Sequence, residues 1–132
     1  MIAVDDRLLI DFERSAEQIT RALKYTGGTH QLSDVFDAIA EGEMQLWSGG
    51  SSVMITKIVD EPRRRDLHFF LVAGDMDEVR SLYSVVLDWG RAKGCEVATM
   101  AGRPGWERTF LADEGWTKTL IVMEKELGHA KK

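Results

Sequence analysis

The chain has 132 residues, of which 44% are apolar and 30% charged, a composition typical of one folded domain and unlike that of a disordered polypeptide. Its net charge of −5 gives no direct signal for binding nucleic acid or an anionic membrane. The single cysteine, Cys95, excludes an internal disulfide, and the sequence predicts neither a signal peptide nor a membrane span. We therefore expect one domain in a reducing compartment such as the cytoplasm.

The first third of the chain predicts a lead-in and two helices. Residues 1–12 alternate weakly between apolar and polar, which is typical of an edge strand or an extended segment. Ser15 and Gln18 have the spacing of a capping box ahead of a helix over about 16–26. Ser33 is a suitable N-cap for a second helix with one apolar face.

The middle of the chain predicts a three-stranded meander. Two apolar runs, 44–47 and 52–59, flank a Ser-Gly-Gly-Ser turn. A charged turn at 61–66 then leads into a third strand over 67–73. These three strands predict consecutive antiparallel pairing.

A crossover follows the meander. Gly74 breaks the strand, and acidic residues within 75–78 open a helix that ends near Gly94. Residues 95–100 form a short apolar run typical of a buried strand. A strand, a helix and a second strand in this order predict a right-handed connection between parallel strands.

The remaining residues predict a helix over about 105–114 and a final strand over 116–127. We therefore expect an α/β (α+β) fold, in which a central mixed, mostly antiparallel sheet of about six strands is flanked by about four helices. Residues 1–132 form the single domain, with a lead-in over 1–14 and a polar tail over 128–132.

The segment ATMAGRPGWERTFLADEGW carries the most specific pattern in the chain. It contains Gly-Arg-x-Gly-Trp at 102–106 and Gly-Trp at 115–116. With the order of elements, it resembles the GCN5-related N-acetyltransferase (GNAT) superfamily, and especially the divergent GNAT-like proteins of tailed bacteriophages. The resemblance covers about residues 33–127 and implies a GNAT-like fold.

The resemblance also implies where a coenzyme would lie. In active GNAT proteins, acetyl-CoA occupies an opening between two splayed strands, and its pyrophosphate rests on amides at the start of the next helix. The matching segment here is 72–78, where only Gly74 fits the family's Gln/Arg-x-x-Gly-x-Gly/Ala motif. Three carboxylates in the first helical turn present like charge to a pyrophosphate, so we expect no cofactor.

Catalytic groups of the family are also missing from this sequence. The last GNAT helix often carries an Asn and a Tyr that protonates the departing thiolate, and Pro104 and Leu111 stand at the matching positions. Tyr83 and Cys95 fall on buried stretches, which favours core packing over catalysis. The resemblance therefore implies a pseudoenzyme.

Three functions stay open. The first is a non-catalytic phage protein, virion-associated or internal to the head or an assembly factor, which acts through protein contacts in the host cytoplasm or the virion. The second is an acetyl-CoA-dependent N-acetyltransferase, in which Gly74, Met76 and Asp77 would contact the pyrophosphate and Glu43 or Asp66 would serve as the base. The third is a small host-directed interaction or inhibitor protein.

Candidate partner-binding residues are Arg103, Trp106 and Arg64. An arginine beside an indole suits a protein contact, and Arg64 is the centre of the one basic cluster, although a structural role competes at each position. The three histidines have no second ligand at a suitable spacing, so no metal site is predicted. An exposed strand edge would allow a homo-oligomer, but no residue selects one.

Overall fold

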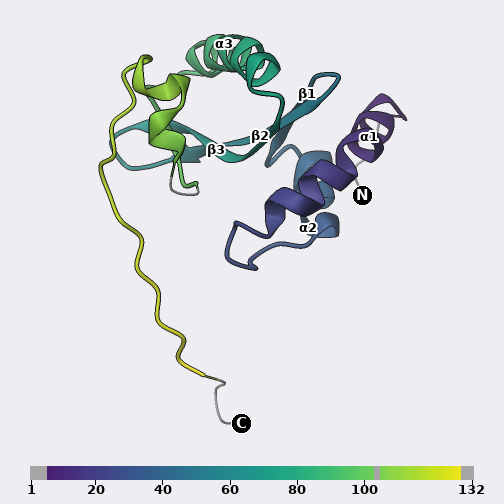
Figure 1. Ribbon diagram of the computed structural model, residues 1–132, viewed down its shortest axis with the longest axis horizontal. Coiled ribbons are helices and arrows are strands. Elements are labelled where there is room, and N and C mark those ends of the chain that lie inside the picture. The colour runs from purple at the N-terminus through teal and green to yellow at the C-terminus, as the bar shows by residue number, and fades with distance from the viewer. Residues whose placement is uncertain (1–5, 103–104, 129–132) are drawn as a thin grey trace.

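A computed structural model describes residues 6–102 and 105–128 (Figure 1). Within these residues the chain forms three α-helices, four strands and two single-turn 3-10 helices. The helices are α1 (Asp6–Leu23), α2 (Leu32–Ala40) and α3 (Met76–Ala92), and the 3-10 turns are Trp106–Arg108 and Phe110–Ala112. The strands are β1 (Gln45–Ser48), β2 (Ser52–Asp60), β3 (Arg65–Gly74) and β4 (Val97–Met100).

The four strands form one sheet in the order β1-β2-β3-β4. The first two pairings are antiparallel, while β3 and β4 are parallel and are connected through α3. This arrangement confirms the predicted meander, the mostly antiparallel sheet and the crossover between the third and fourth strands.

Helices cover both faces of the sheet (Figure 1). Helices α1 and α2 pack on one face against Val53, Ile55 and Leu71. Helix α3 packs on the other face against Leu67 and Phe69. Because β2 lies between the two layers, five consecutive residues of this strand, 52–56, are buried, which is the pattern of a strand covered on both faces.

The predicted starts of the first two helices were wrong. Residues 6–14, expected in the lead-in, belong to α1, whose buried residues Phe12, Ile19 and Leu23 recur at helical spacing. Ser15 is therefore buried inside α1 and is not its cap. Helix α2 begins before Ser33, and residues 1–5 lie outside the described part.

Two further elements depart from the prediction. The helix expected over 105–114 is replaced by the two 3-10 turns, because Thr109 between them has an extended backbone. The strand expected over 116–127 is not formed, since no strand of the described residues pairs with this segment. The expectation of about six strands and four helices is thus corrected to four strands and three α-helices in the described part of the chain.

Candidate functional site

The sheet opens between β3 and β4. These strands pair only from Asp66 with Val97 to Phe69 with Met100. Strand β3 continues to Gly74, whereas the chain leaves the sheet after Met100. Among the described residues, the last part of β3 therefore has no strand partner on this side, and its backbone borders an open space.

A β-bulge lies beside this opening. In the pairing of β2 with β3, Thr56 pairs with Phe69 and Ile55 pairs with Leu71, so Phe70 is the extra residue. The bulge reverses the alternation of β3, since Phe69 packs on the α3 side and Leu71 on the side of α1 and α2. The bulge therefore changes the direction of the β3 backbone at the point where β4 diverges.

The opening is a hollow with aromatic walls. Trp106 packs over Gly102 so closely that a Cβ added to Gly102 would lie 2.7 Å from the indole Cδ1. Tyr25, just after α1, is 59% exposed and lines the same hollow. Its other lining residues come from α1 and the turn after it, from β3, and from the end of β4 with the two residues that follow: Ala22, Thr26, Phe69, Phe70, Leu71, Val72, Met100, Ala101 and Gly102.

The start of α3 is held by its own acidic residues. Asp75 is the N-cap, and its carboxylate accepts a hydrogen bond from the amide of Glu78 at 3.1 Å. Glu78 reaches across to the turn between β1 and β2, where its carboxylate accepts bonds from the Ser52 hydroxyl at 2.6 Å and from the Ser51 amide at 3.0 Å. These hydrogen bonds lower the pKa of Glu78 below its ordinary value of 4.5.

Gly74 is required by the protein's own backbone. It has a φ of +117°, and an added Cβ would overlap the Ser51 carbonyl oxygen and the Cα of Ser52. The Asp75 amide also donates to the Ser51 carbonyl at 3.2 Å. The close approach at Gly74 is therefore made by the turn before β2, with no bound group needed to explain the glycine.

Leu111 and Tyr83, for which the sequence predicted no catalytic role, are part of the core. Leu111, at the position of the family's acid, is 3% exposed. Tyr83 is 6% exposed, and its hydroxyl accepts a hydrogen bond from Trp116 Nε1 at 2.8 Å. Pro104, at the position of the family's Asn, lies outside the described residues, as does Arg103.

The sequence and the fold were also compared with known proteins. No protein-family model and no curated protein matches the sequence. In structure, the chain is similar to a Bacillus halodurans protein solved as a tetramutant (TM-score 0.64, 14% identity, 92% of this chain and 95% of that one). It is also similar to glucosamine-6-phosphate N-acetyltransferase from Arabidopsis thaliana (TM-score 0.57, 12% identity, 86% and 93%).

A third similar structure is an aminoglycoside N-acetyltransferase in complex with CoA (TM-score 0.59, 15% identity, 89% of this chain and 88% of that one). The chain has a GNAT-like fold. At these identities the likeness concerns the fold alone, which agrees with the fold implied by the sequence resemblance.

The two candidate bases lie away from the hollow of this GNAT-like fold. Glu43 is exposed just before β1, the strand at the opposite edge of the sheet from β4. Asp66 lies at the start of β3, is 6% exposed and forms an ion pair with Arg64, with Nε 2.8 Å from Oδ1. The structure therefore does not bring Glu43 and Asp66 together, and neither side chain lines the hollow.

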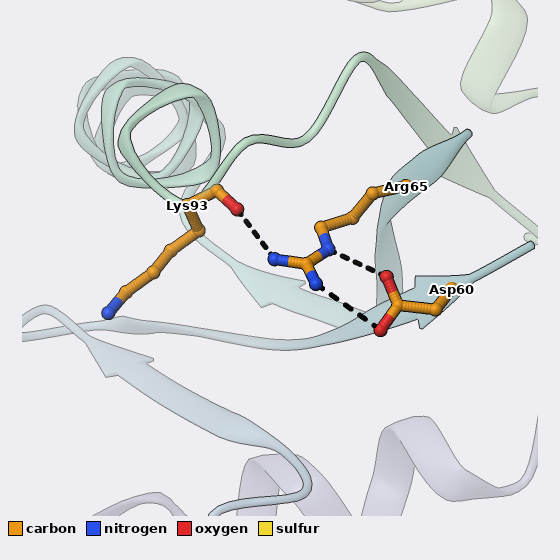
Figure 2. Close-up of polar contacts among 3 residues, drawn as sticks. All are labelled: Asp60, Arg65 and Lys93. Atoms are coloured by element: carbon orange, nitrogen blue, oxygen red, sulfur yellow. Dashed lines mark hydrogen bonds and ion pairs between the residues drawn. The ribbon is translucent and has the colours of Figure 1, made fainter. Parts of the chain in front are cut away.

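The predicted basic cluster at 63–65 is largely engaged within the chain. Arg64 pairs with Asp66, as described above. Arg65 donates to Asp60 at 2.6 Å and to the Lys93 carbonyl, just beyond the end of α3, at 2.8 Å. Figure 2 shows these contacts. The bond to Asp60 raises the pKa of Arg65. Arg65 thus connects the β2–β3 hairpin to the end of α3, whereas Arg64 is paired within the hairpin.

Within the described residues, the remaining reactive or potentially metal-binding side chains do not form a site. Burial raises the pKa of the Cys95 thiol, which disfavours a nucleophilic thiolate. No group of three or more potential metal-binding side chains occurs within the described residues. No helix in that part of the chain is both long and apolar enough to cross a bilayer.

The sequence pointed to the start of α3 but missed two features of this region. Glu78 and Ser52 are separated by 26 residues, and no local pattern indicates their hydrogen bond. The bulge at Phe70 also has no signal within β3, because it depends on the register with β2. Only Gly74 and the acidic residues after it were visible as a motif.

Proposed function

We propose that this chain acts through protein contacts on a GNAT-like fold and does not transfer an acetyl group. The observation that carries the proposal is the engagement of the α3 start by Asp75 and Glu78. Asp75 caps the Glu78 amide, and Glu78 binds Ser51 and Ser52. The region that would receive a coenzyme pyrophosphate therefore already holds carboxylates bonded to the protein's own groups.

Electrostatics supports this reading. A helix start attracts anions because its amides are unpaired and its dipole is positive there. Asp75, Asp77 and Glu78 supply that negative charge from within the chain. A pyrophosphate at the same place would meet three like charges, which opposes binding. The buried Leu111 and the hydrogen-bonded Tyr83 also support a non-catalytic role.

Calorimetric titration with acetyl-CoA tests the absence of coenzyme binding. We expect no saturable heat from the protein as it stands. Asp77→Asn serves as a matched variant, because it removes one negative charge from the α3 start. Among the described residues the Asp77 side chain makes no hydrogen bond, so the substitution breaks none of them. Saturable binding by the unsubstituted protein would overturn the proposal, whatever the variant does.

As the partner, we propose a phage structural protein, with this chain carried in the virion or used in its assembly. The support is the resemblance of the 102–116 segment to GNAT-like proteins of tailed phages. The proposed contact residues are Trp106 and Tyr25 on the walls of the hollow, Arg64 in the exposed β2–β3 turn, and Arg103 in the 102–116 segment.

Mass spectrometry of purified particles, run beside a pull-down from host lysate, tests this partner. Recovery of the chain in particles at a fixed copy number supports a virion role. Recovery only with a host protein would instead support a host-directed inhibitor and would contradict the virion role.

An acetyl-CoA-dependent N-acetyltransferase is the second candidate. The bulge at Phe70 and the open β3 edge favour it, since unpaired backbone groups beside a hollow suit an extended amide-containing ligand. One structure with a similar fold is in complex with CoA. In this alternative Gly74 and the amides of Met76 and Asp77 would bind the pyrophosphate.

Tryptophan fluorescence distinguishes the two candidates. Trp106 lines the hollow, so a coenzyme bound there would change its emission. We expect no saturable change on addition of acetyl-CoA. Under the second candidate, a saturable change in emission would appear and would be lost in Trp106→Leu. Acetylation of an amine would then also require Glu43 or Asp66 as the base.

A further inference from the structure

A polar cleft of about 520 Å³ lies between α1 and the hairpin formed by β1 and β2. It is lined by residues of α1, by Ser48 at the end of β1, and by Gly49 and Gly50 in the turn. Gln18 donates from its side-chain amide to the Ser51 carbonyl at 2.9 Å, which holds α1 beside this turn. The volume is within the range of small-molecule binding sites, and none of the residues proposed for coenzyme contact lines this cleft.

Helix α1 presents a stripe of polar side chains to the cleft. Arg7, Asp11, Arg14 and Gln18 recur at spacings of four, three and four residues, which places them on one face of the helix. This face is distinct from the apolar face that α1 packs against the sheet. Helical periodicity therefore brings charged side chains of both signs to one wall of the cleft.

Two neighbouring side chains of this stripe, of opposite charge, have no partner within the chain. Residues three apart on a helix are close enough to pair, as Asp88 and Arg91 do in α3. Asp11 and Arg14 have the same spacing, but neither makes a hydrogen bond or an ion pair with any residue that the structure describes. Both charged groups are therefore available to a ligand in the cleft.

The β1–β2 turn supplies a backbone donor to the same cleft. The Gly49 amide donates to the Ser52 carbonyl at 3.0 Å, and the Ser51 amide donates to the Glu78 carboxylate. The Gly50 amide between them has no hydrogen-bond partner among residues 6–102 and 105–128. The turn already binds one carboxylate at Ser51, so its backbone suits a second one at Gly50.

We propose that this cleft binds a small zwitterion of the α-amino acid class. The ligand's carboxylate binds the Arg14 guanidinium and the Gly50 amide, and its ammonium group binds the Asp11 carboxylate. Asp11 and Glu78 oppose a plain anion at this place, whereas a zwitterion brings its own positive charge. Arg7 adds positive charge to the same wall, which favours an acidic side chain on the ligand over a basic one.

An NMR titration with L-glutamate, read at the Gly50 amide, tests the site. Arg14→Gln and Arg63→Gln are matched variants, because each removes one positive charge and neither arginine is bonded to another described residue. Arg63 lies in the β2–β3 turn, at the other end of β2 from the cleft. We expect saturable binding by the unsubstituted protein and by Arg63→Gln, and about ten-fold weaker binding by Arg14→Gln, which lacks the charged donor. No saturable shift of the Gly50 amide, or equal affinity in the two variants, would overturn the proposal.

Glutarate separates a zwitterion site from a site for any carboxylate. It has the two carboxylates of glutamate at the same spacing along the chain but no ammonium group. We expect the unsubstituted protein to bind glutamate more tightly than glutarate, and this preference to disappear in Asp11→Asn, because the charge that binds the ammonium group is lost. Equal affinity of the unsubstituted protein for the two ligands, or a preference that persists in Asp11→Asn, would contradict the proposed zwitterion.

Discussion

At the scale of single residues, the glycine at the end of β3 is the most constrained position in the candidate site. Gly74 combines a φ of +117° with backbone atoms of Ser51 and Ser52 where a side chain would begin. The close approach comes from Ser51 and Ser52, where β2 begins. The family motif made this glycine a candidate ligand contact, whereas the structure gives it a complete role within the fold.

Gly74→Ala and Gly28→Ala separate these two demands. Gly28 also has a positive φ, +73°, but nothing lies within 4 Å of an added Cβ. We expect Gly28→Ala to lower the free energy of unfolding by about 1 kcal/mol from backbone strain alone. Gly74→Ala should cost at least about 2 kcal/mol more, because rigid backbone must move. Urea unfolding measures both, and equal losses would show that the contact at Gly74 is relaxed at little cost.

At the scale of elements, His68 connects β3 to β4, and its ionisation should affect their pairing. The His68 ring lies 2.9 Å from the Thr99 hydroxyl of β4. Burial and the charge of Lys57 lower its pKa below the ordinary 6.5, against a smaller opposing effect of Asp66. Below pH 6.5 the unfolded chain therefore binds a proton more readily than the folded chain, so stability is lost as the pH falls toward the folded-state pKa.

A pH series on the protein and on His68→Gln checks this linkage. The unsubstituted protein should lose stability between neutral pH and the lowered pKa of His68, and the variant should lose less over the same interval. The contribution of Glu78, whose pKa is lowered by its hydrogen bonds to Ser52 and Ser51, is lost as the pH falls below its ordinary pKa of 4.5. An NMR titration that placed the pKa of His68 above 6.5 would contradict the assignment.

Elements with local signals were predicted well, and those that depend on distant partners were not. The meander and α3 follow from turn residues, alternation and acidic residues at the helix start, all of which lie within short windows. The spacing of Phe12, Ile19 and Leu23 also predicts α1, but only when the window extends back beyond Ser15. The strand expected over 116–127 needs a neighbouring strand, and no pattern within the segment specifies one.

At the scale of the whole molecule, two layers of core share one sheet. Ile19 is fully buried on the side of α1 and α2, whereas all four tryptophans belong to the cluster on the α3 side. Strand β2 contributes Val53 and Ile55 to the first layer and Met54 to the second. The single domain predicted from the sequence requires that these layers unfold together, because β2 cannot leave one without the other.

Ile19→Ala tests this cooperativity with probes on opposite sides of the sheet. The substitution should lower the free energy of unfolding by about 2 to 5 kcal/mol, as expected for truncating a buried isoleucine. Tryptophan fluorescence reports on the α3 side, and far-ultraviolet circular dichroism reports on all three helices. If the chain is one domain, both signals shift to the same lower urea midpoint, because loss of packing under α1 destabilises the sheet that α3 also needs. A fluorescence midpoint that stays in place while the dichroism midpoint falls would divide the chain into two units.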